Sequence, residues 1–120
     1  MSIGINLDSD FYPEKEESVI GRVFEVSRTV PRRTKHDVLA SLMEEVGELA
    51  TEVNISTGYS GKKEGEDGIL GECVDVITCV VDLMWVSNPN ITEEDLEKEV
   101  MKILELKLAK WKKKKLKGQQ

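Results

Sequence analysis

The sequence predicts an all-α protein, a four-to-five-helix bundle made by a single domain over residues 1–120. Three observations lead to this fold class. Apolar residues recur at intervals of three and four in four separate segments, as in helices with one buried face. No segment alternates apolar and polar residues as a strand would. The length allows one hydrophobic core but not two.

The N-terminal part is expected to contain an irregular lead-in and one helix. Residues 1–13 show no periodicity, and this lead-in ends at Pro13. A helix is predicted from Glu14 to about Val30, because Pro31 interrupts the helical pattern there. The apolar positions of this helix are Val19, Ile20, Val23 and Phe24.

A second helix is predicted over residues 35–56, followed by a flexible loop. Its expected inner face steps by three and four through Leu39, Leu42, Val46, Leu49 and Val53. The segment 57–68 contains four glycines and no apolar periodicity, so we expect a flexible loop there.

Two further helices complete the prediction. Residues 69–86 form a helix that is apolar on nearly every face, so it needs cover on every face. Because one short chain provides little cover, a homo-oligomer is expected. The last helix begins after Thr92, a suitable N-cap residue that is followed by acids in the first turn. Its expected inner face consists of Leu96, Val100, Ile103, Leu104, Lys107, Leu108 and Trp111.

Charge is distributed unevenly along the chain. Residues 1–101 hold 9 Lys and Arg against 22 Asp and Glu, whereas residues 102–120 hold 8 Lys against one Glu. The basic tail over residues 112–120 could bind nucleic acid. It could equally place cations at a helix C-terminus, where the helix dipole favours them. The acidic body argues against a large nucleic-acid footprint, so we favour the second interpretation.

The sequence also indicates the compartment. No segment has about 18 uninterrupted apolar residues, and the start lacks a basic stretch followed by an apolar one. We therefore expect neither a membrane span nor a signal peptide. Cys73 and Cys79 lie six positions apart on one predicted helix, roughly 9 Å, which is beyond disulfide reach. Free thiols suit a cytoplasmic protein.

Acidic residues form a row on each of two predicted helices. The row over residues 35–56 consists of Glu44, Glu45, Glu48 and Glu52, and the row over residues 69–86 consists of Glu72, Asp75 and Asp82. Residues three or four apart share one edge of a helix, and Cys79 lies on the same edge as the second row. The second row is the more unusual one, because the rest of its helix is apolar.

Two such rows facing each other would oppose folding unless a cation lay between them. An ionised carboxylate held away from water without a partner costs several kcal/mol. Lys35 is the only lysine or arginine on either helix. Oxygen ligands favour Mg²⁺ or Mn²⁺ over zinc or copper. A di-iron site would need Glu-x-x-His pairs, and the only histidine, His36, is not in such a pair. The alternative is that the rows are solvated surface acids, and for Asp82 a hydrogen-bonded structural role is equally open.

The two rows together resemble the signature of a known enzyme family. Glu45-x-x-Glu48, preceded by Glu44 and followed after 23 intervening residues by Glu72-x-x-Asp75, is similar to the motif of the MazG-like all-α nucleoside triphosphate pyrophosphohydrolases. The resemblance covers about residues 35–86. It implies hydrolysis of a nucleoside triphosphate to the monophosphate and pyrophosphate. The implied Mg²⁺ ligands, with Mn²⁺ as a substitute ion, are Glu45, Glu48, Glu72 and Asp75, and Glu44 is implied to orient the attacking water.

Substrate contacts are expected from basic and aromatic residues. An acidic site needs cations against a triphosphate, and Lys62, Lys63, Lys107 and Lys110 are the candidates. The alternative for the two loop lysines is that they are simply solvated. Candidates for contact with the base are Trp85, Asn54 and Tyr59, although an aromatic residue on an apolar helix is more often part of the core.

The resemblance also implies an assembly and a setting. Small members of the family are homodimers or homotetramers and are often encoded by phages, which would place this chain in the host cytoplasm. The substrate would be a nucleotide, with dGTP as one candidate. Two other hypotheses stay open: a non-catalytic helical module that binds nucleic acid or a protein through its lysine-rich C-terminus, and a metal-stabilised bundle without turnover.

Overall fold

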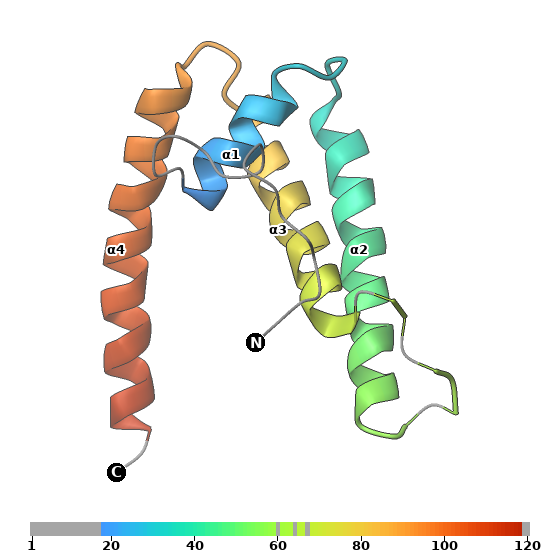
Figure 1. The fold of residues 1–120 in the computed structure, drawn as a ribbon. Coiled ribbons are helices and arrows are strands. Elements are labelled where there is room, and N and C mark those ends of the chain that lie inside the picture. Colours follow the sequence, from blue (N-terminus) through green and yellow to red (C-terminus); the bar gives the residue numbers. More distant parts are fainter. Residues whose placement is uncertain (1–17, 60, 64, 67, 119–120) are drawn as a thin grey trace, which may run out of the picture.

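The computed structural model describes residues 18–59, 61–63, 65–66 and 68–118. Four helices form this part of the chain: α1 (Val19–Ser27), α2 (Lys35–Ser56), α3 (Gly68–Val86) and α4 (Glu93–Lys117) (Figure 1). Because the described residues contain no strand, the predicted all-α class is confirmed. The expected lead-in over residues 1–13 and the predicted first turn of the first helix lie outside the described residues.

Capping side chains set the starts of three helices. The Oγ of Ser18 caps α1. Thr34 forms a capping box with Asp37 at the start of α2, in which each side chain accepts a backbone N–H of the other residue. The predicted cap Thr92 is confirmed, since its Oγ1 accepts the N–H of Asp95 at 3.1 Å. Each cap satisfies backbone donors that a helix start leaves unpaired.

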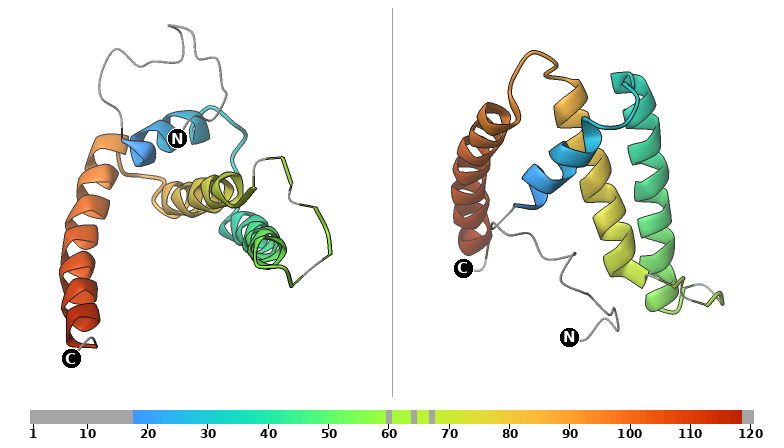
Figure 2. Two further views of the ribbon diagram at one scale, coloured as in Figure 1. Left: turned by 60° about the horizontal axis from the view of Figure 1, so that its bottom comes forward. Right: turned by 45° about the horizontal axis from the view of Figure 1, so that its top comes forward.

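The long helices α2 and α3 run antiparallel and lie side by side (Figure 1). The short helix α1 packs against the C-terminal half of α3 and against the start of α4. Beyond that contact α4 runs away from the α2–α3 pair, as both views in Figure 2 show. Within one chain the helices therefore form a packed pair, a bridging helix and a projecting helix.

The small core lies where α1, α3 and α4 meet. Phe24, Val81 and Leu96 are its buried members, one from each helix. The ring of Trp85 lies 5.6 Å from that of Phe24, centroid to centroid, with 38° between the ring planes. Partly buried side chains surround the three: Ile20, Val23, Met84, Trp85, Ile91 and Val100.

The inner face of α2 differs from the predicted one by about one position. Leu42 and Leu49 are half-buried as expected, but Val46 and Val53 are exposed. Val38 is buried, and so is Glu52. Because α3 is the helix that packs on α2, this rotation turns Glu45 and Glu52 toward α3 and leaves Glu44 and Glu48 exposed.

The predicted inner face of α4 is wrong beyond Val100. Leu96 is buried and Val100 is half-buried, but every residue from Met101 to Gly118 is exposed. The reason is length: α1 has nine residues and α4 has 25, so α1 covers only the first turns of α4. The described helices do not close into a bundle along the whole of α4.

Candidate metal centre

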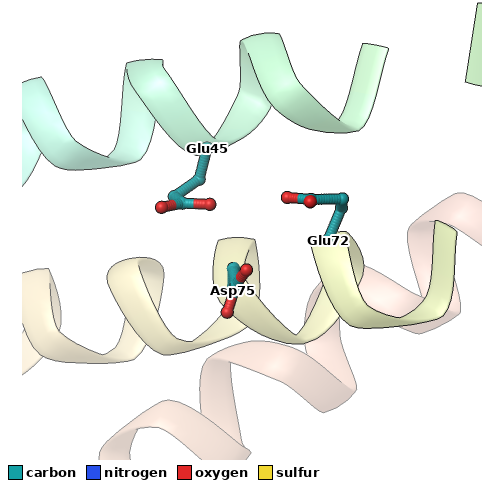
Figure 3. Close-up of side chains that lie close together, drawn as sticks. All are labelled: Glu45, Glu72 and Asp75. Atoms are coloured by element: carbon teal, nitrogen blue, oxygen red, sulfur yellow. The ribbon is translucent and has the colours of Figure 1, made fainter. Parts of the chain in front are cut away.

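Three carboxylates from the two long helices converge. Glu45 projects from α2 toward α3, while Glu72 and Asp75 project from α3 (Figure 3). One oxygen from each of the three lies within 4.8 Å of the others. The spacing of three residues places Glu72 and Asp75 on one edge of α3. The antiparallel packing then brings Glu45 opposite that edge.

Two of these carboxylates are partly withdrawn from water, and each has one oxygen without a hydrogen-bond partner among the described residues. Glu45 and Glu72 are half-buried, and the Oε2 atom of each is buried. No described residue hydrogen-bonds to either atom. Asp75 is exposed at the rim of the cluster. Because buried polar atoms normally have partners, the two oxygens indicate that a cation or another donor belongs there.

The surroundings raise the pKa of both glutamates above the usual value. For Glu45 the main cause is burial, followed by the negative charges of Glu48 and Asp75. For Glu72 burial again comes first, followed by the charges of Glu48, Asp75 and Glu52. Ionising the whole cluster therefore has an energetic cost that a bound cation would remove.

The donors in the cluster fit a hard divalent ion. All three convergent groups offer oxygen, which suits Mg²⁺ or Mn²⁺. Cys79 lies close enough for the charges of Glu45, Asp82 and Asp75 to act on its thiol, but burial and then those charges raise its pKa. Its Sγ is also not among the mutually close ligand atoms of the cluster. The ion pairs between described side chains involve other acids, namely Glu25, Glu93, Asp82 and Glu94.

Of the two remaining acids of the predicted motif, Glu48 lies beside this group, and Glu44 is its neighbour only in sequence. Glu48 is exposed and outside the set of mutually close oxygens, yet its charge raises the pKa of both Glu45 and Glu72. Glu48 therefore borders the cluster. Glu44 is exposed on α2, next in sequence to Glu45 and likewise outside the set of close oxygens.

Asp82 has a structural partner. Its Oδ2 accepts a hydrogen bond from Nε of Arg33 at 3.0 Å, and its Oδ1 accepts a second one from Nη2. The Nη1 of Arg33 also donates to the carbonyl of Pro31 at 2.7 Å. Of the two roles left open by the sequence, the structure shows the hydrogen-bonded acid. The pair ties the connector before α2 to the C-terminal half of α3.

An open cavity of about 650 Å³ lies next to this ion pair. It is mainly apolar, and the residues that line it come from α1, the connector after α1 and α3: Arg22, Val23, Val26, Ser27, Val30, Pro31, Arg33, Thr78 and Asp82. The lining contains none of the three convergent acids, so the cavity is separate from the carboxylate cluster.

Glu52 is a residue whose importance the sequence did not reveal. It is buried against α3, and its Oε1 accepts the N–H of Gly65 at 2.9 Å. Its Oε2 is buried without a partner among the described residues. The sequence could have identified Glu52 by its spacing, because it follows Glu45 by seven residues and therefore lies on the same face of α2. Glu52 joins the acidic cluster to the loop that follows α2.

The predicted substrate-binding residues are spread over the molecule. Lys62 and Lys63 are exposed in the loop after α2, and Asn54 and Tyr59 are exposed at the end of that helix. Trp85 packs with Phe24 in the core. Lys107 and Lys110 are exposed on the projecting half of α4. The structure thus brings together Glu45, Glu72 and Asp75, with Glu48 beside them, while the candidate lysines are exposed on the loop after α2 and on α4.

No described helix is both long and apolar enough to cross a bilayer. The two cysteines are free, as expected from their spacing, and half-buried.

Comparisons with family models, with curated proteins and with solved structures give no match.

Proposed function

We propose that this protein is a Mg²⁺-dependent nucleoside triphosphate pyrophosphohydrolase of the MazG-like type. One observation carries the proposal: three carboxylates from two helices converge, and two of them have buried oxygens without a hydrogen-bond partner among the described residues. Such a group of oxygen donors suits a divalent ion that in turn binds a polyphosphate. In the reaction, water attacks the α-phosphorus, the bond to the bridging oxygen of the β-phosphate breaks, and pyrophosphate leaves.

Each acid has a distinct role in this proposal. Glu45, Glu72 and Asp75 would hold the ion, and Glu48 would complete the set from the border of the cluster. When bound, Mg²⁺ neutralises negative charge on the phosphate oxygens. Glu44 would orient the attacking water and accept its proton, because it is exposed, follows the family motif next to Glu45 and does not belong to the convergent set.

The substrate and assembly follow from the same proposal. The substrate is a ribo- or deoxynucleoside triphosphate, with dGTP as one candidate. The exposed lysines of the loop or of α4 would offset the negative charge of the site toward phosphate. We expect the enzyme to act as a homodimer or homotetramer in the cytoplasm, which would be the host cytoplasm if a phage encodes it.

The test is pyrophosphate release from a panel of nucleoside triphosphates, with Mg²⁺ and then with Mn²⁺. Wild-type protein should release pyrophosphate and the monophosphate from at least one of them. Glu44→Gln should abolish turnover and leave Mg²⁺ binding intact, because Glu44 lies outside the convergent oxygens. Glu45→Gln should weaken both.

Two results would contradict the proposal. One is the absence of turnover with every nucleotide and either ion. The other is equal activity of wild type and Glu45→Gln. If Mg²⁺ stabilises wild type but not Glu45→Gln, and no nucleotide is hydrolysed, the protein is the metal-stabilised bundle that the sequence also allowed.

A second candidate function has a specific observation in its favour. All residues of α4 after Val100 are exposed, and they include eight lysines. This half-helix could bind the phosphates of a nucleic acid, with an affinity that falls steeply as salt rises. Deleting residues 112–120 separates the two candidates, because hydrolysis should survive the deletion whereas nucleic-acid binding should be lost.

A further inference from the structure

Among the residues that the structure describes, Glu52 is the only charged residue that is buried, with 8% of its surface exposed. Its Oε1 accepts the backbone N–H of Gly65 at 2.9 Å. Its Oε2 is buried as well, and no described residue donates a hydrogen bond to it. Because a buried carboxylate oxygen normally has a donor or a cation beside it, the unpaired oxygen of Glu52 indicates a binding position.

Glu52 lies on the side of the acidic cluster that Glu72 occupies. It follows Glu45 by seven residues and shares the face of α2 that packs on α3, about 10 Å farther along the helix. After burial, which is the main cause, the negative charge of Glu52 is one of those that raise the pKa of Glu72. The charges that act on Glu45 are those of other acids. The Oε2 of Glu72 is also buried without a partner among the described residues, so each of the two facing helices contributes a buried, unpaired oxygen.

No lysine or arginine on these two helices is near enough to pair with Glu52. Lys35 is the only one, and it lies 17 residues before Glu52, roughly 26 Å along α2. An ion held by the three convergent acids would not reach Glu52 either, because Glu52 is outside the set of oxygens that lie within 4.8 Å of one another. Oxygens bound to one Mg²⁺ at about 2.1 Å can be at most about 4.2 Å apart. Glu52 therefore needs a partner of its own.

The charge of the cluster also favours more than one cation. Five acids gather between α2 and α3: Glu45, Glu48, Glu52, Glu72 and Asp75. When all five are ionised, one divalent cation leaves three negative charges uncompensated. A second divalent cation would reduce the excess to one and would lower the repulsion between these acids.

From these observations we propose that Glu52 and Glu72 bind a second divalent cation, Mg²⁺ or Mn²⁺, beside the ion of the three convergent acids. Glu72 is then shared between the two ions. Two carboxylates and several waters are a usual ligand set for Mg²⁺. Because the other oxygen of Glu52 accepts the N–H of Gly65, the second ion also stabilises the attachment of the loop after α2.

The second site is separate from the motif that resembles a known family. Glu52 is not one of the acids of that motif, so the resemblance does not imply a ligand at this position. The site depends only on the burial and the contacts of Glu52 and Glu72. Its effect on hydrolysis, which is to lower the repulsion of an anionic triphosphate, rests on the proposed function.

The test is the number of Mn²⁺ ions that the full chain binds after treatment with a chelator, measured by calorimetry and by electron paramagnetic resonance. Wild type should bind two ions per chain. Glu52→Gln should bind one, because the amide has nearly the same size but its nitrogen is a donor and does not bind a hard cation. The amide oxygen can still accept the N–H of Gly65, so this variant keeps the loop contact.

Glu66→Gln is the matched control. It removes the same charge from an exposed residue next to Gly65, and it should still bind two ions. Gly65→Ala is the complementary variant, because a Cβ at this position would lie 2.6 Å from Oε1 of Glu52. It keeps every carboxylate of the cluster, so it should bind two ions while the loop contact is lost.

The loop provides a second measurement that does not depend on catalysis. Lys62 and Lys63 are exposed on this loop and are sites for trypsin. With Mn²⁺ at about ten times its dissociation constant, cleavage of wild type should slow by up to about tenfold, because the ion stabilises the form in which Glu52 holds Gly65. Mn²⁺ should not slow the cleavage of Glu52→Gln or of Gly65→Ala.

Four results would overturn the inference: a single ion bound per wild-type chain, a second ion bound equally well by Glu52→Gln, loss of that ion in Glu66→Gln, or cleavage of wild type that Mn²⁺ does not change. The first result is decisive even if Glu52→Gln does not fold. Two bound ions without turnover of any nucleotide would count against the proposed function alone. Turnover by a chain that binds one ion would count against the second site alone.

Discussion

Replacing Arg33 with Met removes the guanidinium that holds Asp82. The pair connects the segment just before α2 to α3, and it uses two hydrogen bonds between the two charged groups. Met keeps much of the aliphatic length of Arg and loses the charge and the donors. The substitution therefore tests the ion pair with little change in packing.

The burial of the pair sets the size of the effect. The exposed fractions of the two side chains are 28% for Arg33 and 16% for Asp82. Breaking a fully buried pair costs about 3–5 kcal/mol, and an exposed pair contributes about 0–1 kcal/mol. For this intermediate burial we expect the free energy of unfolding to fall by about 2 kcal/mol. For a chain of this length that corresponds to a loss of about 8 °C in Tm.

The assay is urea and thermal unfolding followed by circular dichroism. Arg32→Met is the control, because Arg32 is an exposed neighbour on the same connector. Adding Asp82→Asn and the double variant completes a double-mutant cycle. The cycle should give a coupling energy of about 1–2 kcal/mol between positions 33 and 82.

The reasoning would be refuted if Arg33→Met and Arg32→Met were equally stable. A coupling energy near zero would have the same meaning, since it would show that the two groups contribute independently. Either result would show that the ion pair is not the contact that holds the connector before α2 against α3.

Two further predictions concern the acidic cluster and its loop. Since the folded-state pKa values of Glu45 and Glu72 are raised above 4.5, their contribution to stability is present below pH 4.5 and is lost as pH rises through the raised values. Thermal unfolding in the presence of a chelator should show this decline in stability. The substitution Glu45→Gln should flatten the decline, and added Mg²⁺ should oppose it. A metal-free wild type that becomes more stable than Glu45→Gln toward neutral pH would contradict the prediction. Gly65→Ala should cost about 1 kcal/mol and speed proteolysis of the loop, because its Cβ would lie 2.6 Å from Oε1 of Glu52 and displace the hydrogen bond to that atom. Gly61→Ala, with open space around it, is the control, and equal effects of the two substitutions would contradict the argument.

Much of the helical content was predictable because local signals mark it. The predicted bounds of α2, residues 35–56, agree with the structure, and α3 begins one residue before the predicted start. Thr92 was recognisable as a cap because a side-chain oxygen followed by acids suits the N–H groups of a helix start. The positions of Glu45, Glu72 and Asp75 on helix edges that carry other acids were also predictable, because residues three or four apart share one edge of a helix.

Other features depend on contacts between segments far apart in the chain. Periodicity defines a stripe on α2 but leaves its rotation uncertain by about one position, so the outward turn of Val46 and the burial of Glu52 appear only when α3 is in place. The role of Asp82 depended on Arg33, which is 49 positions away. Spacing along one helix carries no information about such a partner.

By itself the sequence determined which segments are helical and which edges carry acids, because both depend on residues within a few turns of each other. The tertiary structure decided which acids meet, which acid forms an ion pair with an arginine, and how far along α4 the apolar face is covered by α1. Those outcomes depend on how helices pack and on their relative lengths. The nine residues of α1 cannot shield the 25 of α4, and the same apolar pattern is therefore core at one end of that helix and surface at the other.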